Sequence, residues 1–229
     1  MAIHVSLDFE TLSLKPDAVL LSLGACTFDP ETGEVGNEFY LAIDPRTQHQ
    51  RHISADTVLW WLKQDEAART KLTSAIEARE KLDEDGDFTD EQLTELMEQA
   101  AHPIHHVARA FILWFEQLGE VQGVWTNGGV DHTWMDSLME YSGFKVPYPF
   151  WLQRDYRTLK GLYPEVKAEF TGTKHNALDD AIHQAKHALV LLKEQAKHEQ
   201  LRALVVTGNG ESNTALDIAE SLATKESEK

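Results

Sequence analysis

The amino-acid sequence predicts an α/β fold built on a mixed β-sheet that is flanked by helices. Three observations lead to this prediction. Strand-like segments follow one another near the N-terminus, helical periodicity dominates from residue 54, and strands and helices alternate from about residue 121. Consecutive strands joined by tight turns predict antiparallel pairs, whereas alternating strands and helices predict parallel ones. The two patterns in one chain therefore indicate a mixed sheet.

The first strand-like segment ends in two acidic residues. Ile3, Val5 and Leu7 alternate with polar residues, which is the period-2 pattern of a β-strand. Asp8 and Glu10 lie two positions apart, so their side chains point to the same face and repel each other. A divalent cation such as Mg²⁺ takes carboxylate oxygens and would remove this cost. The alternative is a strand that ends at Leu7, with both acids solvated in a turn.

The next two segments continue the sheet. Residues 18–28 form a nearly continuous apolar run, residues 29–34 carry turn residues, and residues 37–43 form a further strand-like segment. This arrangement predicts an antiparallel meander in which the apolar run is the central strand. Cys26 lies in that run and is expected to be a small core residue rather than a catalytic thiol.

A helical pattern begins at residue 54. Ser54 is a favourable N-cap, and we expect a helical insertion over about 54–100. Within this insertion, residues 81–90 are polar and acidic and are expected to form a loop. The pair Trp60 and Trp61 allows two interpretations, which are core packing and a surface on which a nucleobase stacks.

The second half of the chain alternates between strands and helices. The expected elements are a helix over 104–118, a strand over 121–126, a helix over 131–141, a short strand over 150–155, a helix over 156–163 and a long helix after the polar loop 172–176. Beyond it we expect a short edge strand over 204–206, a helix over 214–223 and a frayed end over 225–229. No Gly- or Pro-rich linker divides the chain, so we expect one domain over 1–200 and a partly flexible C-terminal extension over 201–229.

Composition limits the classes of function. The chain has 229 residues and a formal net charge of −17. Proteins that coat nucleic acid by charge alone rely on Lys and Arg, so this charge argues against that class. It does not exclude an enzyme that holds a strand end through metal ions. The sequence shows no run of about 20 apolar residues and no signal-peptide pattern. We therefore expect a cytoplasmic protein without membrane attachment.

Two further acids accompany the first pair. Asp131 begins a helix directly after a strand and a Gly-Gly turn, at a place where sites often form beside the ends of sheet strands. Asp180 lies in the first turns of the long helix, and His175 lies in the loop before it. With Asp8 and Glu10, these residues make a set of four acids and one histidine.

Three segments that carry this set resemble the exonuclease motifs of the DEDDh 3′→5′ exonuclease family. The segments are Asp8-Phe9-Glu10-Thr11-Leu12, Asn127-Gly128-Gly129-Val130-Asp131 and His175-Asn176-Ala177-Leu178-Asp179-Asp180. The third matches the family pattern His-x-Ala-x-x-Asp, which selects Asp180 over Asp179. The resemblance extends from about Ile3 to Leu192. Within the family, the chain looks most similar to the phage and bacterial exonucleases typified by phage T4 exodeoxyribonuclease A.

The resemblance implies an RNase H-like fold that holds two Mg²⁺ or Mn²⁺ ions. Asp8, Glu10, Asp131 and Asp180 would be the ligands, directly or through water. Two such ions clamp the scissile phosphate, activate the attacking water and stabilise the leaving 3′-oxygen. His175 would be the general base that takes the proton from this water. These five residues are the expected catalytic set.

The resemblance also implies contacts with the terminal nucleotide of the substrate. Thr11, Leu12, Trp61 and Asn127 are the expected substrate-binding residues. The frequent Thr-Thr-Gly ending of the first family motif is replaced here by Thr11-Leu12-Ser13. We therefore expect the details of these contacts to differ from those of relatives.

The expected function is a two-metal 3′→5′ exonuclease that acts on the 3′ end of single-stranded nucleic acid and releases nucleoside 5′-monophosphates. DNA is preferred over RNA as the substrate on the resemblance alone. One alternative is an exoribonuclease that trims short RNAs. Another is a proofreading or docking partner of a polymerase or repair protein, which would use residues 201–229. A homodimer is left open, because the sequence carries no signal for assembly.

Overall fold

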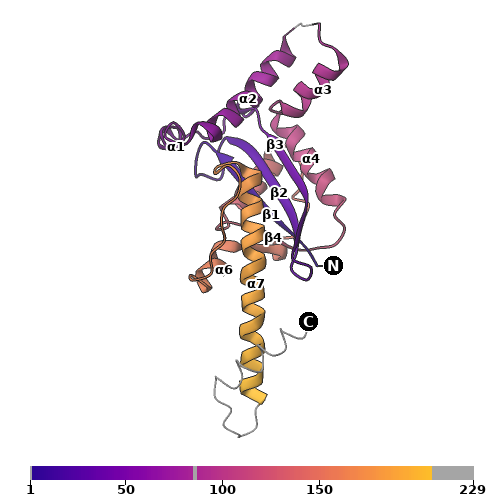
Figure 1. Cartoon of the computed structure of the whole chain (residues 1–229). Coiled ribbons are helices and arrows are strands. Elements are labelled where there is room, and N and C mark those ends of the chain that lie inside the picture. Colours follow the sequence, from indigo (N-terminus) through magenta and orange to yellow (C-terminus); the bar gives the residue numbers. More distant parts are fainter. Residues whose placement is uncertain (1, 85–86, 208–229) are drawn as a thin grey trace.

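A five-stranded mixed β-sheet forms the centre of the protein. The computed structural model describes residues 2–84 and 87–207 (Figure 1). The strands are β1 (Ile3–Thr11), β2 (Leu20–Asp29), β3 (Glu34–Ala42), β4 (Val121–Thr126) and β5 (Gln153–Asp155). Their order across the sheet is β3-β2-β1-β4-β5. The first three pair as an antiparallel meander with β2 in the middle, and β4 and β5 run parallel to β1. The predicted mixed sheet is confirmed, and so is the prediction that the apolar run forms the central strand of the meander.

Helices surround this sheet and extend beyond it. They are α1 (Ala55–Trp61), α2 (Glu66–Asp83), α3 (Asp90–Gln99), α4 (Ile104–Glu116), α5 (Val130–Tyr141), α6 (Tyr156–Leu162) and α7 (Ala177–Thr207). Two short 3₁₀ helices, η1 (Pro45–Thr47) and η2 (Phe150–Leu152), complete the described elements. Ser54 caps α1 as expected, because its hydroxyl accepts a hydrogen bond from the Thr57 N–H.

The two faces of the sheet pack against different helices. On one face, Val5, Leu7 and Phe9 of β1 belong to the same apolar core as side chains of α4 and α5. On the other face, Cys26 of β2 is buried with side chains of α6 and α7. Alternation along β1 consequently turns Asp8 and the other even-numbered residues towards α7.

Helix α7 lies unusually close to the sheet where it begins. A Cβ atom added to Gly24 of β2 would stand 2.2 Å from the backbone carbonyl carbon of Ala177, so only glycine fits this contact. Gly24 is the partner of Asp8 in the β1–β2 ladder. The helix also presents small buried residues to the sheet, which are Ala177, Ala181, Ala185 and Ala188. The start of α7 is therefore held directly beside the acids of β1.

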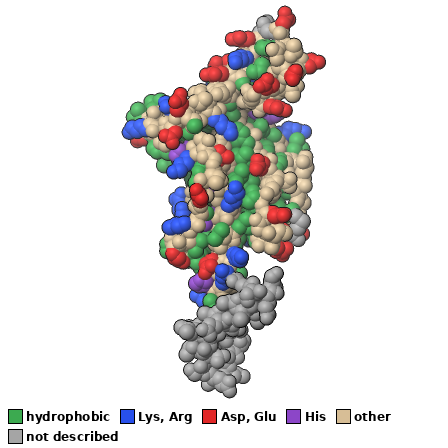
Figure 2. All heavy atoms as spheres, viewed as in Figure 1, with side chains coloured by type: hydrophobic (Ala, Val, Ile, Leu, Met, Phe, Trp, Pro, Cys, Tyr) green, Lys and Arg blue, Asp and Glu red, His purple; other side chains and the backbone are tan. Residues whose placement is uncertain are grey.

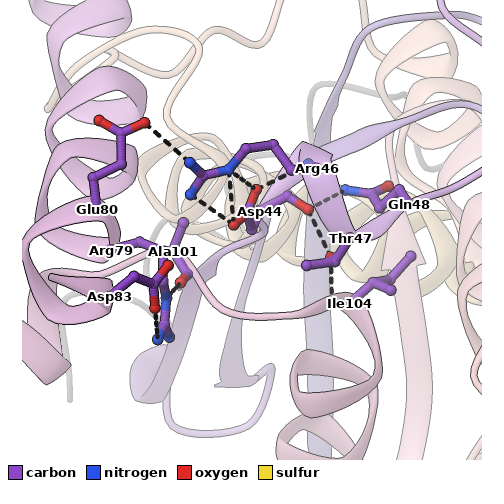
Figure 3. Close-up of polar contacts among 9 residues, drawn as sticks. All are labelled: Asp44, Arg46, Thr47, Gln48, Arg79, Glu80, Asp83, Ala101 and Ile104. Atoms are coloured by element: carbon purple, nitrogen blue, oxygen red, sulfur yellow. Dashed lines mark hydrogen bonds and ion pairs between the residues drawn. The ribbon is translucent and has the colours of Figure 1, made fainter.

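The helices α2 and α3 project from the body of the molecule, and their Asp and Glu side chains crowd this end (Figures 1 and 2). Polar contacts fix α2 to η1, the short helix after β3, and to the segment before α4 (Figure 3). The Arg46 guanidinium lies 2.9 Å from the Asp44 carboxylate and 3.0 Å from that of Glu80. The Arg79 Nε donates to the Ala101 carbonyl oxygen at 2.8 Å. The insertion is thus attached to the sheet region by charged side chains at its base.

Three local predictions were wrong. Residues 204–206 belong to α7 and do not form an edge strand. Residues 150–152 form η2, so that only Gln153–Asp155 is a strand. The acidic loop is shorter than 81–90, because α2 continues to Asp83 and α3 begins at Asp90. At residues 204–206 the long helix continues because adding a residue to an existing helix costs little, and the favourable helix formers Lys81 and Leu82 extend α2.

The predicted division at residue 200 falls inside α7, which continues to Thr207. The helix expected over 214–223 and the frayed end over 225–229 lie outside the described residues. The expected domain over 1–200 and the extension over 201–229 stay predictions.

A first test concerns the contact at Gly24. The Gly24→Ala substitution forces a methyl group into the backbone of α7 and should lower the free energy of unfolding by about 1–3 kcal/mol. The matched control is Gly36→Ala on β3, where a Cβ would meet only the Thr27 hydroxyl at an ordinary 3.5 Å. Urea unfolding followed by circular dichroism measures the free energy of unfolding of both variants. Equal small losses would contradict the close packing of α7 on β2.

Candidate active site

The acids of β1 point into the space beside the start of α7. Asp8 and Glu10 lie on the α7 side of the strand, opposite Gly24 and Ser22 of β2. Glu10 is buried and Asp8 is partly buried. The sequence prediction that both side chains share one face is therefore confirmed by the position of this strand in the sheet.

Asp131 reaches the same place from the end of β4. Gly128 and Gly129 have φ angles of 103° and 75°, which are left-handed conformations that glycine adopts readily, and they turn the chain sharply into α5. The Asp131 carboxylate accepts a hydrogen bond of 3.1 Å from the N–H of Phe9, the residue between Asp8 and Glu10. Asp131 is 3% exposed. The parallel β1–β4 pairing thus brings the third acid to the first two.

The start of α7 contributes the fourth acid and the histidine. The Asp180 carboxylate accepts a 2.9 Å hydrogen bond from the backbone N–H of His175. Ligand atoms of Glu10, His175 and Asp180 all lie within 4.8 Å of one another. Asp179 points elsewhere and accepts from the Thr173 N–H at 2.8 Å. The predicted choice of Asp180 over Asp179 as the residue that faces the other acids agrees with this geometry.

Burial raises the pKa of all four carboxyl groups, and neighbouring acids of the cluster raise the pKa values of Asp8 and Glu10 further. Burial and the neighbouring acids Asp131, Glu10 and Asp180 hold the pKa of Asp8 well above its ordinary value. Burial, Asp180 and Asp131 raise the pKa of Glu10 to about 8. Burial raises the pKa of Asp131 to about 7 against the opposing effects of its backbone hydrogen bonds and of Arg157, and burial also raises the pKa of Asp180. Without a counter-ion, the ionised form of this cluster is strongly disfavoured.

This arrangement fits a hard divalent cation. The donors are carboxylate oxygens, which Mg²⁺ and Mn²⁺ prefer, and a cation would remove the repulsion that raises the pKa values of these groups. Asp8, Glu10, Asp131 and Asp180 are close enough for their charges to interact, and a nitrogen of His175 lies within 4.8 Å of carboxylate oxygens of Glu10 and Asp180. The site can therefore hold metal and place it beside an ionisable imidazole.

Sequence reasoning missed one member of this cluster. The side-chain amide of Gln184 donates a 2.8 Å hydrogen bond to the Asp8 carboxylate, and its own Oε1 is buried without a hydrogen-bond partner. Gln184 lies four residues after Asp180 and so on the same side of α7. That spacing was the available signal, but Gln is common on helices and the spacing alone singles out no role.

An aromatic pocket opens beside the acids. It has a volume of about 430 Å³ and is lined by residues from the end of β1, from α1 and from α5, including Glu10, Thr11 and Trp134. The buried Trp61 donates from its indole Nε1 to the Thr11 carbonyl oxygen at 2.9 Å. Trp60 is 42% exposed, and its ring stands edge-on to the His175 ring at 4.8 Å. The two interpretations of this pair apply to different residues, since Trp61 packs inside and Trp60 presents its ring at the surface.

The other two residues expected to bind substrate, Leu12 and Asn127, do not line this pocket. The backbone of Leu12 is used internally, because its N–H donates to Val19 and its carbonyl oxygen accepts from Ser54. Asn127 lies at the turn before Asp131, where its carbonyl oxygen accepts a 2.9 Å hydrogen bond from Arg157.

Asp155 and Arg157 support the site from the side of β5. The Asp155 carboxylate caps α6 by accepting from the Arg157 N–H at 2.9 Å. Arg157 in turn packs against Gly128, where an added Cβ would stand 2.8 Å from its guanidinium carbon. Asp155 therefore holds Arg157, the residue that packs against the turn before Asp131.

A comparison with protein families identifies the chain. The family model described as the 3′-5′ exoribonuclease Rv2179c-like domain matches residues 3–192, which is most of the sequence. The chain belongs to this family. It is therefore an enzyme of the 3′–5′ exonuclease class, and the Rv2179c-like domain includes all four acids and His175. No curated protein gives a significant match to this chain.

Solved structures of exonucleases share the fold. A 3′-exonuclease that recognises the 3′ end of the histone mRNA stem-loop has a TM-score of 0.53 at 14% identity, over 84% of this chain and 82% of that chain. The nuclease domain of 3′hExo, a DEDDh family member bound to rAMP, has a TM-score of 0.52 at 15% identity, over 84% of this chain and 92% of that chain. A product-bound exonuclease I has a TM-score of 0.50 at 13% identity, over 89% of this chain and 46% of that one. The Rv2179c-like domain therefore has the expected RNase H-like mixed β-sheet flanked by helices.

These structural similarities do not test every prediction made from the sequence. The narrower similarity to phage T4 exodeoxyribonuclease A stays a prediction. Among the residues that the structure describes, none of the helices is both long and apolar enough to cross a membrane.

The raised pKa values predict how stability depends on pH. Folding raises the pKa of Glu10 from its ordinary value of 4.5 to about 8 and the pKa of Asp131 from 3.8 to about 7. Between these limits the folded protein keeps protons that the unfolded chain has released, so the free energy of unfolding should fall as pH rises from about 5 to 8. Mg²⁺ binds the ionised carboxylates of the folded state and should restore stability most at pH 8.

Thermal melts in EDTA and in Mg²⁺, at several pH values, check this expectation. The Asp131→Asn variant removes one carboxyl group with a raised pKa, so its melting temperature in EDTA should depend less on pH. A melting temperature that rises with pH over this range in EDTA would contradict the proposed charge repulsion.

Proposed function

We propose that this protein is a metal-dependent 3′→5′ exonuclease that removes nucleoside 5′-monophosphates from single-stranded 3′ ends, with RNA as the favoured substrate. The observation that carries the proposal is the cluster of four carboxylates around the start of α7, with His175 and an aromatic pocket at its edge. The family description supports RNA. The slight preference for DNA that the sequence suggested is kept as the alternative that the experiment decides.

Asp8, Glu10, Asp131 and Asp180 would hold the metal ions, and two Mg²⁺ or Mn²⁺ are proposed. Bound there, the ions would supply charge stabilisation for the phosphate and activation of the attacking water. Gln184 supports this role by holding the Asp8 carboxylate in a fixed orientation. A positioned hydrogen-bond partner of this kind orients a ligand and limits its movement.

The aromatic pocket would take the last nucleotide of the strand. Its volume is in the range of small-ligand pockets. Glu10 lines it together with Thr11 and the Trp60–Trp61 pair. Aromatic rings stack on any nucleobase and so bind without sequence preference. A base in this pocket would leave the preceding phosphate near the carboxylates, which is the position that removal of one terminal nucleotide needs.

Hydrolysis would then proceed by transfer of the phosphoryl group to water. The water oxygen bonds to phosphorus while the bond from phosphorus to the 3′-oxygen of the preceding nucleotide breaks. His175 would accept the proton of the water through its imidazole, which has a nitrogen within 4.8 Å of carboxylate oxygens of Glu10 and Asp180. The products are a nucleoside 5′-monophosphate and a strand that is one residue shorter.

A role as a proofreading or docking partner remains an alternative that residues 201–229 would serve. No described feature favours it over catalysis, since the acids, the histidine and the pocket are all present in one place.

The proposal is tested with matched RNA and DNA oligonucleotides, each labelled at the 5′ end. The wild-type protein should shorten RNA stepwise in Mg²⁺, shorten DNA more slowly, and show no activity in EDTA. The Asp8→Asn variant should stay folded and lose at least about 100-fold in rate, because it removes charge that binds metal. Asp90→Asn, which changes an exposed acid on α3, is the matched control and should keep the wild-type rate.

A folded Asp8→Asn protein with the wild-type rate would contradict the metal site. Faster cleavage of DNA than of RNA would leave the mechanism intact and reverse the substrate assignment. Binding of both strands without any cleavage would favour the docking alternative.

The role of His175 makes a separate prediction. Loss of a positioned general base typically costs about 10²–10⁴-fold in rate, so His175→Ala should lower kcat by that amount. Its affinity for Mn²⁺, measured by calorimetry, should stay near that of wild type because all four carboxylates remain. The control is His105→Ala, an exposed histidine on α4. A large loss of Mn²⁺ affinity in His175→Ala would show that the imidazole is a ligand instead.

A further inference from the structure

The loop that carries His175 is fixed by a residue that the proposed chemistry does not use. Asp179 is adjacent to Asp180, yet its carboxylate accepts a 2.8 Å hydrogen bond from the backbone N–H of Thr173. Thr173 lies two residues before His175. Asp179 therefore reaches back from the first turn of α7 to the segment that precedes the histidine.

The same carboxylate packs against Gly172. A Cβ added to Gly172 would stand 2.6 Å from the Asp179 carboxyl carbon and 2.9 Å from each of its oxygens. Gly172 also has a φ of +109°, a conformation that L side chains rarely adopt. The chain is thus shaped at Gly172 to let the backbone close over the Asp179 side chain.

Further hydrogen bonds complete the connection between loop and helix. The Asn176 Oδ1 accepts from the N–H groups of Leu178 and Asp179 at 3.2 Å each, which caps α7. The Asn176 N–H donates to the Thr173 carbonyl oxygen at 3.2 Å, and the His175 N–H donates to Asp180. The loop is therefore tied to the helix at residues 173, 175 and 176.

This support is needed because His175 has a strained backbone. Its φ of 63° is left-handed, which costs a non-glycine residue about 1–2 kcal/mol. Such a conformation persists only where the surroundings fix it, and it is often found at functional sites. Asp180 supplies one of the fixing contacts, but it also belongs to the carboxylate cluster. Asp179 supplies the contact that is free of this second role.

We propose that Asp179 is a positioning residue that holds the 172–176 loop, through Thr173 and Gly172, in the conformation that presents His175 to the site. The inference rests on the proposed function, in which His175 takes the proton of the attacking water. It makes Asp179 act on the proton-transfer step through His175 and not through metal.

The test compares two substitutions at one position. Asp179→Asn keeps an oxygen that can accept from the Thr173 N–H and should stay within about threefold of the wild-type kcat. Asp179→Ala removes the acceptor and should lower kcat by about 10- to 100-fold, because a misplaced catalytic group costs rate. The KM for the oligonucleotide and the affinity for Mn²⁺ should not change in either variant. Equal large losses in both, with weaker Mn²⁺ binding, would show that Asp179 is a metal ligand.

A double-mutant comparison tests whether the effect passes through His175. In a His175→Ala background, Asp179→Ala should cause no further loss of rate, since the group that it positions is already absent. If the rate of the double variant falls by the product of the two single losses, the two residues act independently and the proposal is overturned. Gly172→Ala should reproduce the kcat defect of Asp179→Ala. Its control is Gly161→Ala in α6, where an added Cβ meets nothing within 4 Å.

Amide hydrogen exchange gives a readout that does not depend on activity. The amides of residues 172–176 should exchange faster in Asp179→Ala than in wild type or Asp179→Asn, at unchanged melting temperature. If the wild-type protein cleaves no oligonucleotide, the proposed function fails. The exchange comparison still shows whether Asp179 holds the 172–176 loop in place. Unchanged exchange in Asp179→Ala, or an unchanged kcat in an active enzyme, would overturn the positioning role.

Discussion

The close contact between Gly24 and the first turn of α7 is the constraint on which the site depends. Gly24 stands opposite Asp8 in the sheet, and the backbone of Ala177 lies where a side chain would otherwise be. This contact brings residues of α7 to the acids of β1, so that Gln184 can donate to Asp8 across 176 positions of sequence. Any side chain at position 24 would separate the two halves of the carboxylate cluster.

The remainder of the fold supports a cluster that is unfavourable on its own. Like charges that are buried together destabilise a protein, and here neighbouring acids raise the pKa values of Asp8 and Glu10. Apolar cores on both faces of the sheet keep the strands in place despite this repulsion. Functional sites commonly retain such unfavourable arrangements because binding a ligand relieves them. In this protein a divalent cation would provide the relief.

The sequence predicted the elements whose patterns are local and missed the contacts that depend on packing. The alternation of apolar and polar residues predicted β1, and the spacing of the third motif selected Asp180 over Asp179. Gln184 carried no local signal, because its role comes only from the approach of α7 to Asp8. Residues 204–206 are apolar and partly β-branched, so their propensity suggested a strand. They instead continue a helix that already has more than six turns, where adding a residue costs little.

The charge of the chain gives the last constraint. A protein with a net charge of −17 does not attract a phosphate backbone through its overall charge, so attraction has to be local. The basic groups Arg157 and Lys174 act on Asp131 and Asp180 within the site, and the aromatic pocket adjoins it. A strand gripped only there is held by its final nucleotide and not along its length. In the proposed function this arrangement suits removal of residues from an end, since the pocket beside the carboxylates would take the last nucleotide of the strand.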